Sequence, residues 1–145
     1  YLPEGKWTNF ISGKTYEGGR YVTEYHDYLS IPMMVKENSI VPVGANNQIP
    51  DYDFGKDVTL EVFELLNGKE ASAQVLNKDS EVVLTATALR TENTIEFNVE
   101  ANDAYSIVLR GINEISNVEG ASFELSDKGI KLIPNGNVTK IVCNM

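Results

Sequence analysis

A period of two in hydrophobicity, repeated in short segments between turn-forming residues, is the feature that most constrains the fold of this chain. Within Thr94–Glu100, the apolar residues Ile95, Phe97 and Val99 alternate with polar ones, and Tyr105–Arg110 repeats the pattern. Successive side chains of a strand point to opposite faces of a sheet, so each segment predicts a half-buried β-strand. Convincing helical periodicity is absent from the sequence, and we expect an all-β fold.

Further strand candidates share this alternation or a short apolar run, and turn formers such as Gly18-Gly19, Asn67-Gly68 and Asn135-Gly136 separate them. These candidates are Lys6–Phe10, Arg20–Glu24, Pro32–Lys36, Ser39–Val43, Val58–Leu66, Ala71–Leu76, Glu81–Leu89, Ala121–Leu125, Ile130–Ile133 and Val138–Cys143. The stretch Glu61–Leu66 also fits a helix, but its β-branched and aromatic neighbours favour a strand. Many short strands at close spacing predict antiparallel β-sandwich modules.

The composition changes near the middle of the chain. Most aromatic residues and all but one of the prolines precede residue 58, and the change falls across the polar loop Gly44–Asp53. We therefore expect residues 1–52 to be the C-terminal part of one β-sandwich and residues 53–145 to be a second, distal β-sandwich. The sequence also starts directly in the apolar, turn-rich run Tyr1–Phe10, which predicts that it belongs to a longer protein.

Charge and residue counts exclude several kinds of partner and site. The net charge of −9 makes nucleic acid and anionic membrane surfaces unsuitable partners. The single cysteine, Cys143, allows no disulfide within the chain, and the single histidine, His26, allows no multi-histidine zinc site. No apolar run approaches the roughly 20 residues that a membrane-spanning helix needs. We expect no cofactor and no metal.

The acidic loop before Val58 is the first place to look for chemistry. Asp51 and Asp53 form a tempting carboxylate pair for glycoside hydrolysis, which needs two carboxyl groups across a sugar-binding cleft. Together with Asp57 they also supply the oxygen ligands that calcium prefers. The loop contains no EF-hand pattern, and it lies beside Pro50. A solvated turn is therefore the favoured interpretation over catalysis or calcium binding.

Two further residues have chemically reactive side chains. His26 lies between acidic residues and could act as a general base, but no serine or cysteine occupies a nucleophile motif, so a surface or structural role is favoured. Cys143 lies in a strand pattern, which favours a small buried apolar residue. Asn137–Thr139 fits a glycosylation sequon, which matters only in a secreted protein. The sequence thus predicts no catalytic residue.

A group of aromatic residues in the first module has two possible roles. Its members are Trp7, Tyr16, Tyr21, Tyr25 and Tyr28. Aromatic faces can stack on sugar rings, and large aromatic side chains also build the cores of small sandwiches. The core is the favoured interpretation, and the sugar-stacking surface is the alternative.

Three motifs of the first 55 residues resemble the region that follows the catalytic barrel in glycoside hydrolase family 31, the family of α-glucosidases and α-xylosidases. The family pattern Tyr-Leu-Pro-x-Gly-x-Trp falls at Tyr1–Trp7, its Gly-Gly turn at Gly18–Arg20, and its stretch that begins Pro-x-x-x-Arg and ends in Gly at Pro32–Gly44. Lys36 stands where the family typically has arginine. The stretch Asn47–Tyr52 most resembles bacterial α-xylosidases.

The resemblance implies a fold and a role. Family members carry a (β/α)₈ barrel with two catalytic aspartates, followed by a proximal and a distal C-terminal β-sandwich, so no residue of this chain inherits a catalytic role. The expected function is a non-catalytic accessory region that braces the barrel of a retaining α-xylosidase or α-glucosidase. The expected partner is the barrel, and contacts with further copies of the protein are a second expectation. Carbohydrate substrate is expected to bind only to other parts of the longer protein. The expected location is a bacterial cytoplasm. The alternative is an autonomous carbohydrate-binding β-sandwich.

Overall fold

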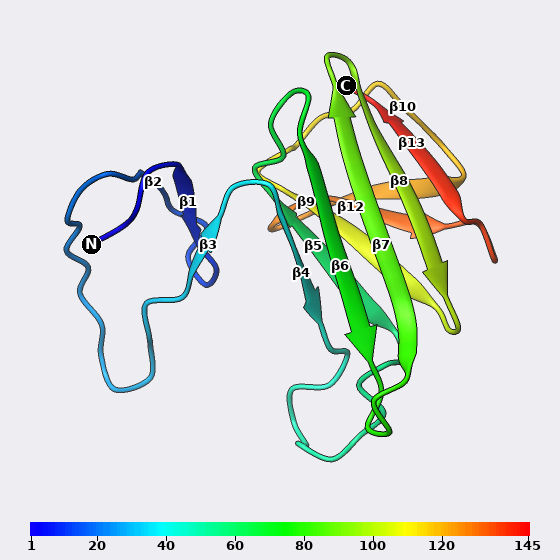
Figure 1. Cartoon of the computed structure of the whole chain (residues 1–145), viewed down its shortest axis with the longest axis horizontal. Coiled ribbons are helices and arrows are strands. Elements are labelled where there is room, and N and C mark those ends of the chain that lie inside the picture. The colour runs from blue at the N-terminus through cyan, green and yellow to red at the C-terminus, as the bar shows by residue number, and fades with distance from the viewer.

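The computed structural model describes residues 1–145 and is built from strands, turns and loops. It contains one three-stranded sheet and two five-stranded sheets, which confirms the all-β class. Figure 1 shows the three-stranded sheet as a separate body at the N-terminal end, in blue and cyan, beside a sandwich that runs from green to red. No helix in the structure is long and apolar enough to cross a bilayer.

The N-terminal sheet has the strand order β2-β1-β3, formed by β1 (Lys6–Asn9), β2 (Thr15–Glu17) and β3 (Met34–Lys36). The Gly-Gly turn after β2 packs against the first residues of the chain. The amide of Gly18 donates to the carbonyl of Gly5 at 2.7 Å, and a Cβ at Gly18 would lie 1.8 Å from the carbonyl oxygen of Pro3. Only glycine permits this backbone approach.

The sandwich consists of two five-stranded sheets. One has the order β10 (Asn117–Glu119), β13 (Lys140–Asn144), β8 (Thr94–Ala101), β7 (Val82–Thr91) and β6 (Glu70–Leu76). The other has the order β11 (Ala121–Ser126), β12 (Gly129–Pro134), β9 (Tyr105–Arg110), β5 (Val58–Phe63) and β4 (Ser39–Val43). All neighbours are antiparallel except β5 and β9, which pair in parallel.

The core lies between these two sheets and follows the predicted alternation. On β8, Ile95, Phe97 and Val99 are each at most 2% exposed, and Ile107 and Leu109 of β9 are similarly buried. Burial of one such side chain stabilises the fold by roughly 1.5–3 kcal/mol. The period of two in these strands therefore determines which of their faces closes the sandwich.

Several strand predictions differ from the structure. Arg20–Glu24 forms no strand and contributes only an isolated bridge between Arg20 and Leu2. The predictions also omitted β2 and β10, because each is only three residues long and exists through pairing with a longer neighbour. Glu61–Leu66 is a strand through Phe63 and not a helix, as its neighbours predicted.

The strand β4 precedes the predicted module boundary but belongs to the sandwich. It pairs with β5 from Ser39↔Phe63 to Val43↔Thr59, and the loop 44–57 joins the two strands. The division between residues 52 and 53 stays a prediction, and this pairing places residues from both sides of it in one sheet. No local pattern in the sequence indicates that β4 would pair with the strand that follows it.

Candidate functional site

A polar site lies at the junction between the N-terminal sheet and the sandwich. The strand β5 is buried on both faces, because Val58, Leu60 and Val62 face the core while Glu61 and Phe63 face outwards. The ring of Phe10, which follows β1, stacks on Phe63 with ring centroids 5.9 Å apart. The N-terminal body therefore covers part of the outer face of this sheet.

A buried carboxylate with two cationic partners lies beside these rings. Glu61 accepts from Arg110 Nη1 at 3.0 Å through Oε2 and from Lys128 Nζ at 2.8 Å through Oε1. The second guanidinium nitrogen of Arg110, Nη2, donates to the carbonyl of Phe10 at 2.9 Å. The guanidinium carbon also lies 5.0 Å from the ring centroid of Phe63. Arg110 thus contacts the sandwich and the N-terminal body at once.

A second ion pair supports the same junction. Lys6 of β1 donates from Nζ to Glu64 Oε2 at 2.8 Å, and Glu64 directly follows β5. The corner between β3 and β4 is closed by Asn38, whose side-chain oxygen accepts from the amide of Leu66 at 2.8 Å. Asn38 has a φ of 57°, a conformation that asparagine tolerates better than most residues. These contacts fix how the N-terminal sheet sits on the sandwich.

Another polar network lies beside β1 and β2, centred on Glu24. Its carboxylate accepts from the hydroxyl of Tyr16, from Asn9 Nδ2 at 3.0 Å, and is 3.1 Å from His26 Nε2. The hydrogen bond from Tyr16 is the main reason why the pKa of Glu24 is lowered from its ordinary value. Ser30 Oγ lies 3.3 Å from His26 Nδ1. His26 therefore lies within a hydrogen-bonded network of the N-terminal body.

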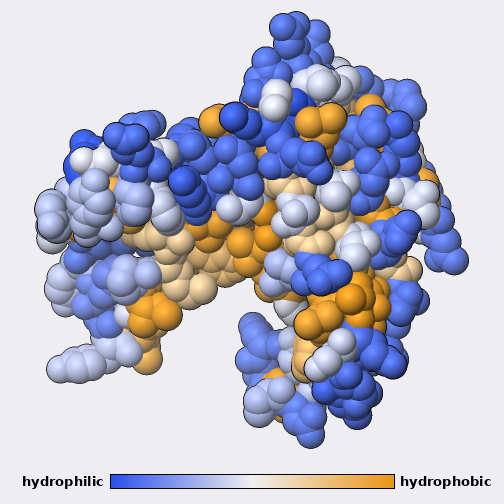
Figure 2. All heavy atoms as spheres, viewed as in Figure 1, coloured by the Kyte–Doolittle hydropathy of each residue, from blue (hydrophilic) through white to orange (hydrophobic).

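The connection 21–33 between Gly19 and β3 exposes most of its large apolar side chains. Tyr25 is 93% and Leu29 95% exposed, and Tyr21, Tyr28 and Ile31 are also exposed. Figure 2 shows apolar spheres on the lower side of the N-terminal body, and others along β4 between that body and the sandwich. We call residues 21–33 the uncovered connection.

The expectation that the aromatic group forms a core is wrong for three of its members. Tyr21, Tyr25 and Tyr28 point to solvent, because three short strands make no second layer to cover them. Tyr16 and Trp7 face each other across β1 and β2 and are half-buried, and Trp7 Nε1 donates to the carbonyl of Pro3 at 2.8 Å.

The structure does not bring the remaining candidates together into a site. Asp51, Asp53 and Asp57 are exposed in the loop 44–57, where Asp53 accepts from the amide of Gly55 at 3.3 Å and pairs with Lys56 at 3.4 Å. This is the solvated turn that the sequence favoured. No three His, Cys, Asp or Glu side chains gather into a group that could hold a metal ion.

Cys143 lies inside the sandwich core, as its strand pattern predicted. Its side chain is fully buried, and this burial raises the pKa of the thiol to about 12. Asn137 and Thr139 of the sequon are exposed in the loop before β13.

Sequence reasoning missed the Glu61–Arg110 pair. The available signal was a charged residue in the middle of an otherwise apolar strand, Val58–Phe63, because a strand buried on both faces needs a partner for any charge that it carries. Arg110 ends a similar apolar run. Nothing in the sequence shows that these two strands are neighbours in parallel register.

Comparison with known protein families gives two matches that cover most of the chain. Residues 1–41 match the model described as Glycosyl hydrolase family 31 C-terminal domain. Residues 53–145 match the model described as Alpha-xylosidase YicI, C-terminal domain. Both matches agree with the resemblance that the motifs of the first 55 residues predict.

Two curated proteins are similar in sequence. Alpha-xylosidase XylQ from Lactiplantibacillus pentosus is 28% identical over 124 residues, and an alpha-xylosidase from Emericella nidulans is 30% identical over 95 residues. The matched regions cover 75% and 60% of this chain but only 16% and 12% of those two relatives. The chain thus spans a small part of the length of the relatives that it matches.

Solved structures share the fold over almost the whole chain. A GH31 dextranase from Flavobacterium johnsoniae superposes with a TM-score of 0.76 at 18% identity, covering 99% of this chain and 23% of the dextranase. A cycloalternan-forming enzyme from Listeria monocytogenes gives the same TM-score at 15% identity, covering 99% of this chain and 16% of that enzyme.

Proposed function

Because the chain belongs to the C-terminal region of glycoside hydrolase family 31, we propose that it is a non-catalytic accessory region that braces the catalytic barrel of a longer α-glycosidase. That longer protein would hydrolyse α-xylosides or α-glucosides with retention, using two carboxyl groups that lie outside this chain. The alpha-xylosidase descriptions of the two curated relatives favour an α-xyloside as its substrate. This chain would contribute stability and position, and no reacting group.

The observation that carries the proposal is the uncovered connection. Tyr25, Tyr28 and Leu29 are each at least 93% exposed, although the sheet beside them is well formed. Clustered exposed apolar side chains typically mark a surface that another folded unit covers. The barrel is the partner that the family supplies, and these side chains would bury against it.

The junction supports the bracing role. Arg110 and Glu61 hold the N-terminal body against the sandwich through buried, charge-assisted hydrogen bonds. A body attached in one orientation presents the uncovered connection to the barrel at a defined angle. The sandwich would therefore act as a rigid support for the surface that docks.

Co-purification tests this proposal. The barrel-containing part of the longer protein and this 145-residue chain are expressed as two polypeptides, and one of them carries an affinity tag. We expect the two to co-purify, and we expect Leu29→Asp to reduce the recovered complex at least tenfold, because a charge would be buried in the contact. Leu125→Asp is the matched control, since Leu125 is also an exposed leucine, on β11 of the sandwich.

Activity measurements complete the test. We expect no hydrolysis of an aryl α-xyloside by the chain alone and restored hydrolysis in the complex. An equal loss of complex with both aspartate variants, or no complex with the unaltered chain, would refute the docking role of the uncovered connection. Hydrolysis by the chain alone that disappears in Asp51→Asn or Asp53→Asn would refute the non-catalytic assignment.

A further inference from the structure

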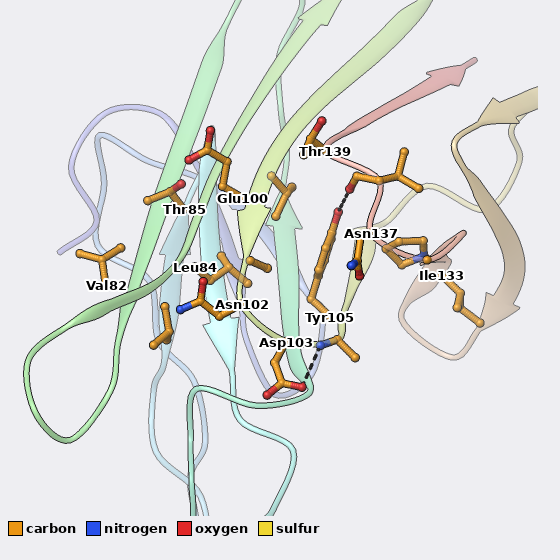
Figure 3. A pocket seen from close by; sticks show the side chains of 17 residues that line it. Val82, Leu84, Thr85, Glu100, Asn102, Asp103, Tyr105, Ile133, Asn137 and Thr139 are labelled. Atoms are coloured by element: carbon orange, nitrogen blue, oxygen red, sulfur yellow. Dashed lines mark hydrogen bonds between the residues drawn. The ribbon is translucent and has the colours of Figure 1, made fainter.

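A cavity opens between the two sheets at one end of the sandwich, far from the junction in the fold. Its volume is about 650 Å³, within the range of roughly 300–1,000 Å³ that is typical of small-ligand sites. The walls come from the start of β7, the end of β8 with the turn that follows it, the start of β9, the end of β12 and the loop before β13. Figure 3 shows the side chains that line it.

Polar side chains without partners line this cavity. Asn102, Asn137 and Thr139 contribute hydroxyl and amide groups, and none of the three makes a side-chain hydrogen bond within the chain. Each of these groups can both donate and accept hydrogen bonds. The lining therefore offers several free donors and acceptors around one space, which suits a ligand that carries many hydroxyl groups.

One aromatic ring, that of Tyr105, lines the cavity. Figure 3 shows Tyr105 between Leu84 and Asn102 on one side and Asn137 on the other. Its hydroxyl donates to the carbonyl of Val138 at 3.2 Å, which fixes the orientation of the ring. Leu84 and Ile133 add apolar surface nearby. A fixed ring with apolar neighbours and free polar groups matches both the apolar faces and the hydroxyl edges of a sugar.

The charges of the lining restrict the ligand further. Asp103 is a charged residue of the cavity wall, the side chain of Glu100 lies on the outer face of β8, and no lysine or arginine belongs to the wall. An anionic ligand would meet the carboxylate of Asp103 and no compensating cation. The lining therefore disfavours an anionic ligand and accepts a neutral one.

We propose that this cavity is a binding site for a neutral oligosaccharide, separate from any site in the barrel. It would keep a sugar substrate bound to the longer protein, while the reaction takes place in the barrel. The site depends on residues of this chain alone. Its test and the co-purification test therefore fail independently of each other.

Nuclear magnetic resonance titration of the full 145-residue chain tests the proposal. The probes are maltotriose and the disaccharide isoprimeverose, each added up to about 20 mM, the range suited to millimolar affinities. We expect saturable shifts of backbone amides in residues 82–85, 99–105 and 136–139 with at least one probe. We expect sodium glucuronate, an anionic sugar, to cause no saturable shifts in these residues.

Two variants separate binding from folding. The double variant Asn102→Ala with Asn137→Ala removes two free amides from exposed loops, and we expect it to weaken binding at least tenfold. Asn93→Ala, in the exposed turn between β7 and β8 at the opposite end of the sandwich, should bind like the unaltered chain. Absence of saturable shifts with both neutral sugars would overturn the proposal. Equal binding by the double variant, or shifts located elsewhere, would overturn it as well.

Discussion

Arg110 and Glu61 form a hydrogen-bonded ion pair of 3.0 Å whose side chains are 6% and 2% exposed. They lie on the outer face of two parallel neighbours, β9 and β5, where the N-terminal body covers them. Burial of a charge is unfavourable unless an opposite charge compensates it, so Glu61 and Arg110 each compensate the buried charge of the other. Lys128 adds a second cation to Glu61 but is 41% exposed. Loss of Glu61, Arg110 or Lys128 should therefore destabilise the fold to different extents.

We predict that Glu61→Leu is the most destabilising change in this cluster, by about 3–5 kcal/mol, because it leaves the guanidinium of Arg110 buried without a carboxylate. Arg110→Met should cost less, since Lys128 still neutralises Glu61. The double variant should recover most of the loss, because apolar residues can replace a buried pair. Urea unfolding measures all three free energies of unfolding.

Lys131→Met is the control for the loss of a cation at the surface. Lys131 pairs with Glu124 at 3.2 Å, and the two side chains are 37% and 56% exposed, so its removal should change the free energy of unfolding by less than about 1 kcal/mol. If Glu61→Leu cost no more than Lys131→Met, the buried pair would not stabilise the junction.

A second prediction concerns the only thiol. Cys143 is fully buried and its pKa is raised to about 12, so the reactive thiolate is scarce in the folded chain at pH 8. We expect a thiol reagent such as Ellman's reagent to react with the folded chain at least a hundredfold more slowly than with the chain unfolded in urea. Reaction at the same rate in both states would place Cys143 outside the core.

The alternation of the longer strands was enough to predict the sandwich class. Ile95, Phe97 and Val99 are buried because one face of β8 meets the opposite sheet, and a period of two encodes that face directly. Short strands carry too few residues for such a pattern. Thr15–Glu17 forms a strand because it pairs with β1, and this pairing is not visible in the local sequence.

The junction could not be predicted from the sequence for a related reason. Glu61 and Arg110 are far apart in the chain, and their contact depends on the parallel pairing of β5 with β9. The burial of the aromatic group was also set by tertiary structure. Tyr25 and Tyr28 are of a residue type that often builds cores, but no second layer of this chain covers them.

A third prediction concerns the pH dependence of the Glu24 network. The hydroxyl of Tyr16 donates to Glu24 and holds the pKa of this carboxyl below its ordinary value of 4.5. The stability that this network contributes is therefore present above the ordinary pKa and is lost as the pH falls through the lowered one. Carboxyl carbon shifts measured against pH should show Glu24 titrating below 4.5.

Two tyrosine variants check the cause of that shift. Tyr16→Phe removes the hydroxyl and should move the midpoint of Glu24 upwards, whereas Tyr21→Phe removes the hydroxyl of an exposed ring and should leave it unchanged. A Glu24 midpoint that did not respond to Tyr16→Phe would contradict the assigned cause.

The last prediction concerns Trp7, the single tryptophan, which reports on the N-terminal sheet alone. Its ring is half-buried on β1 opposite Tyr16, and its indole nitrogen donates to Pro3. We therefore expect intermediate quenching by iodide, between that of a buried and a free indole.

Substitutions at Trp7 separate the hydrogen bond from the packing. Trp7→Phe should cost about 0.5–1.5 kcal/mol, the usual worth of one hydrogen bond. Trp7→Ala should cost more, but less than the roughly 3–5 kcal/mol of a fully buried tryptophan. Because Trp7 lies outside the sandwich, both variants should leave the slow thiol reaction of Cys143 unchanged. Full iodide quenching together with an unaltered stability in Trp7→Ala would instead identify the ring as a free surface, as the sugar-stacking alternative requires.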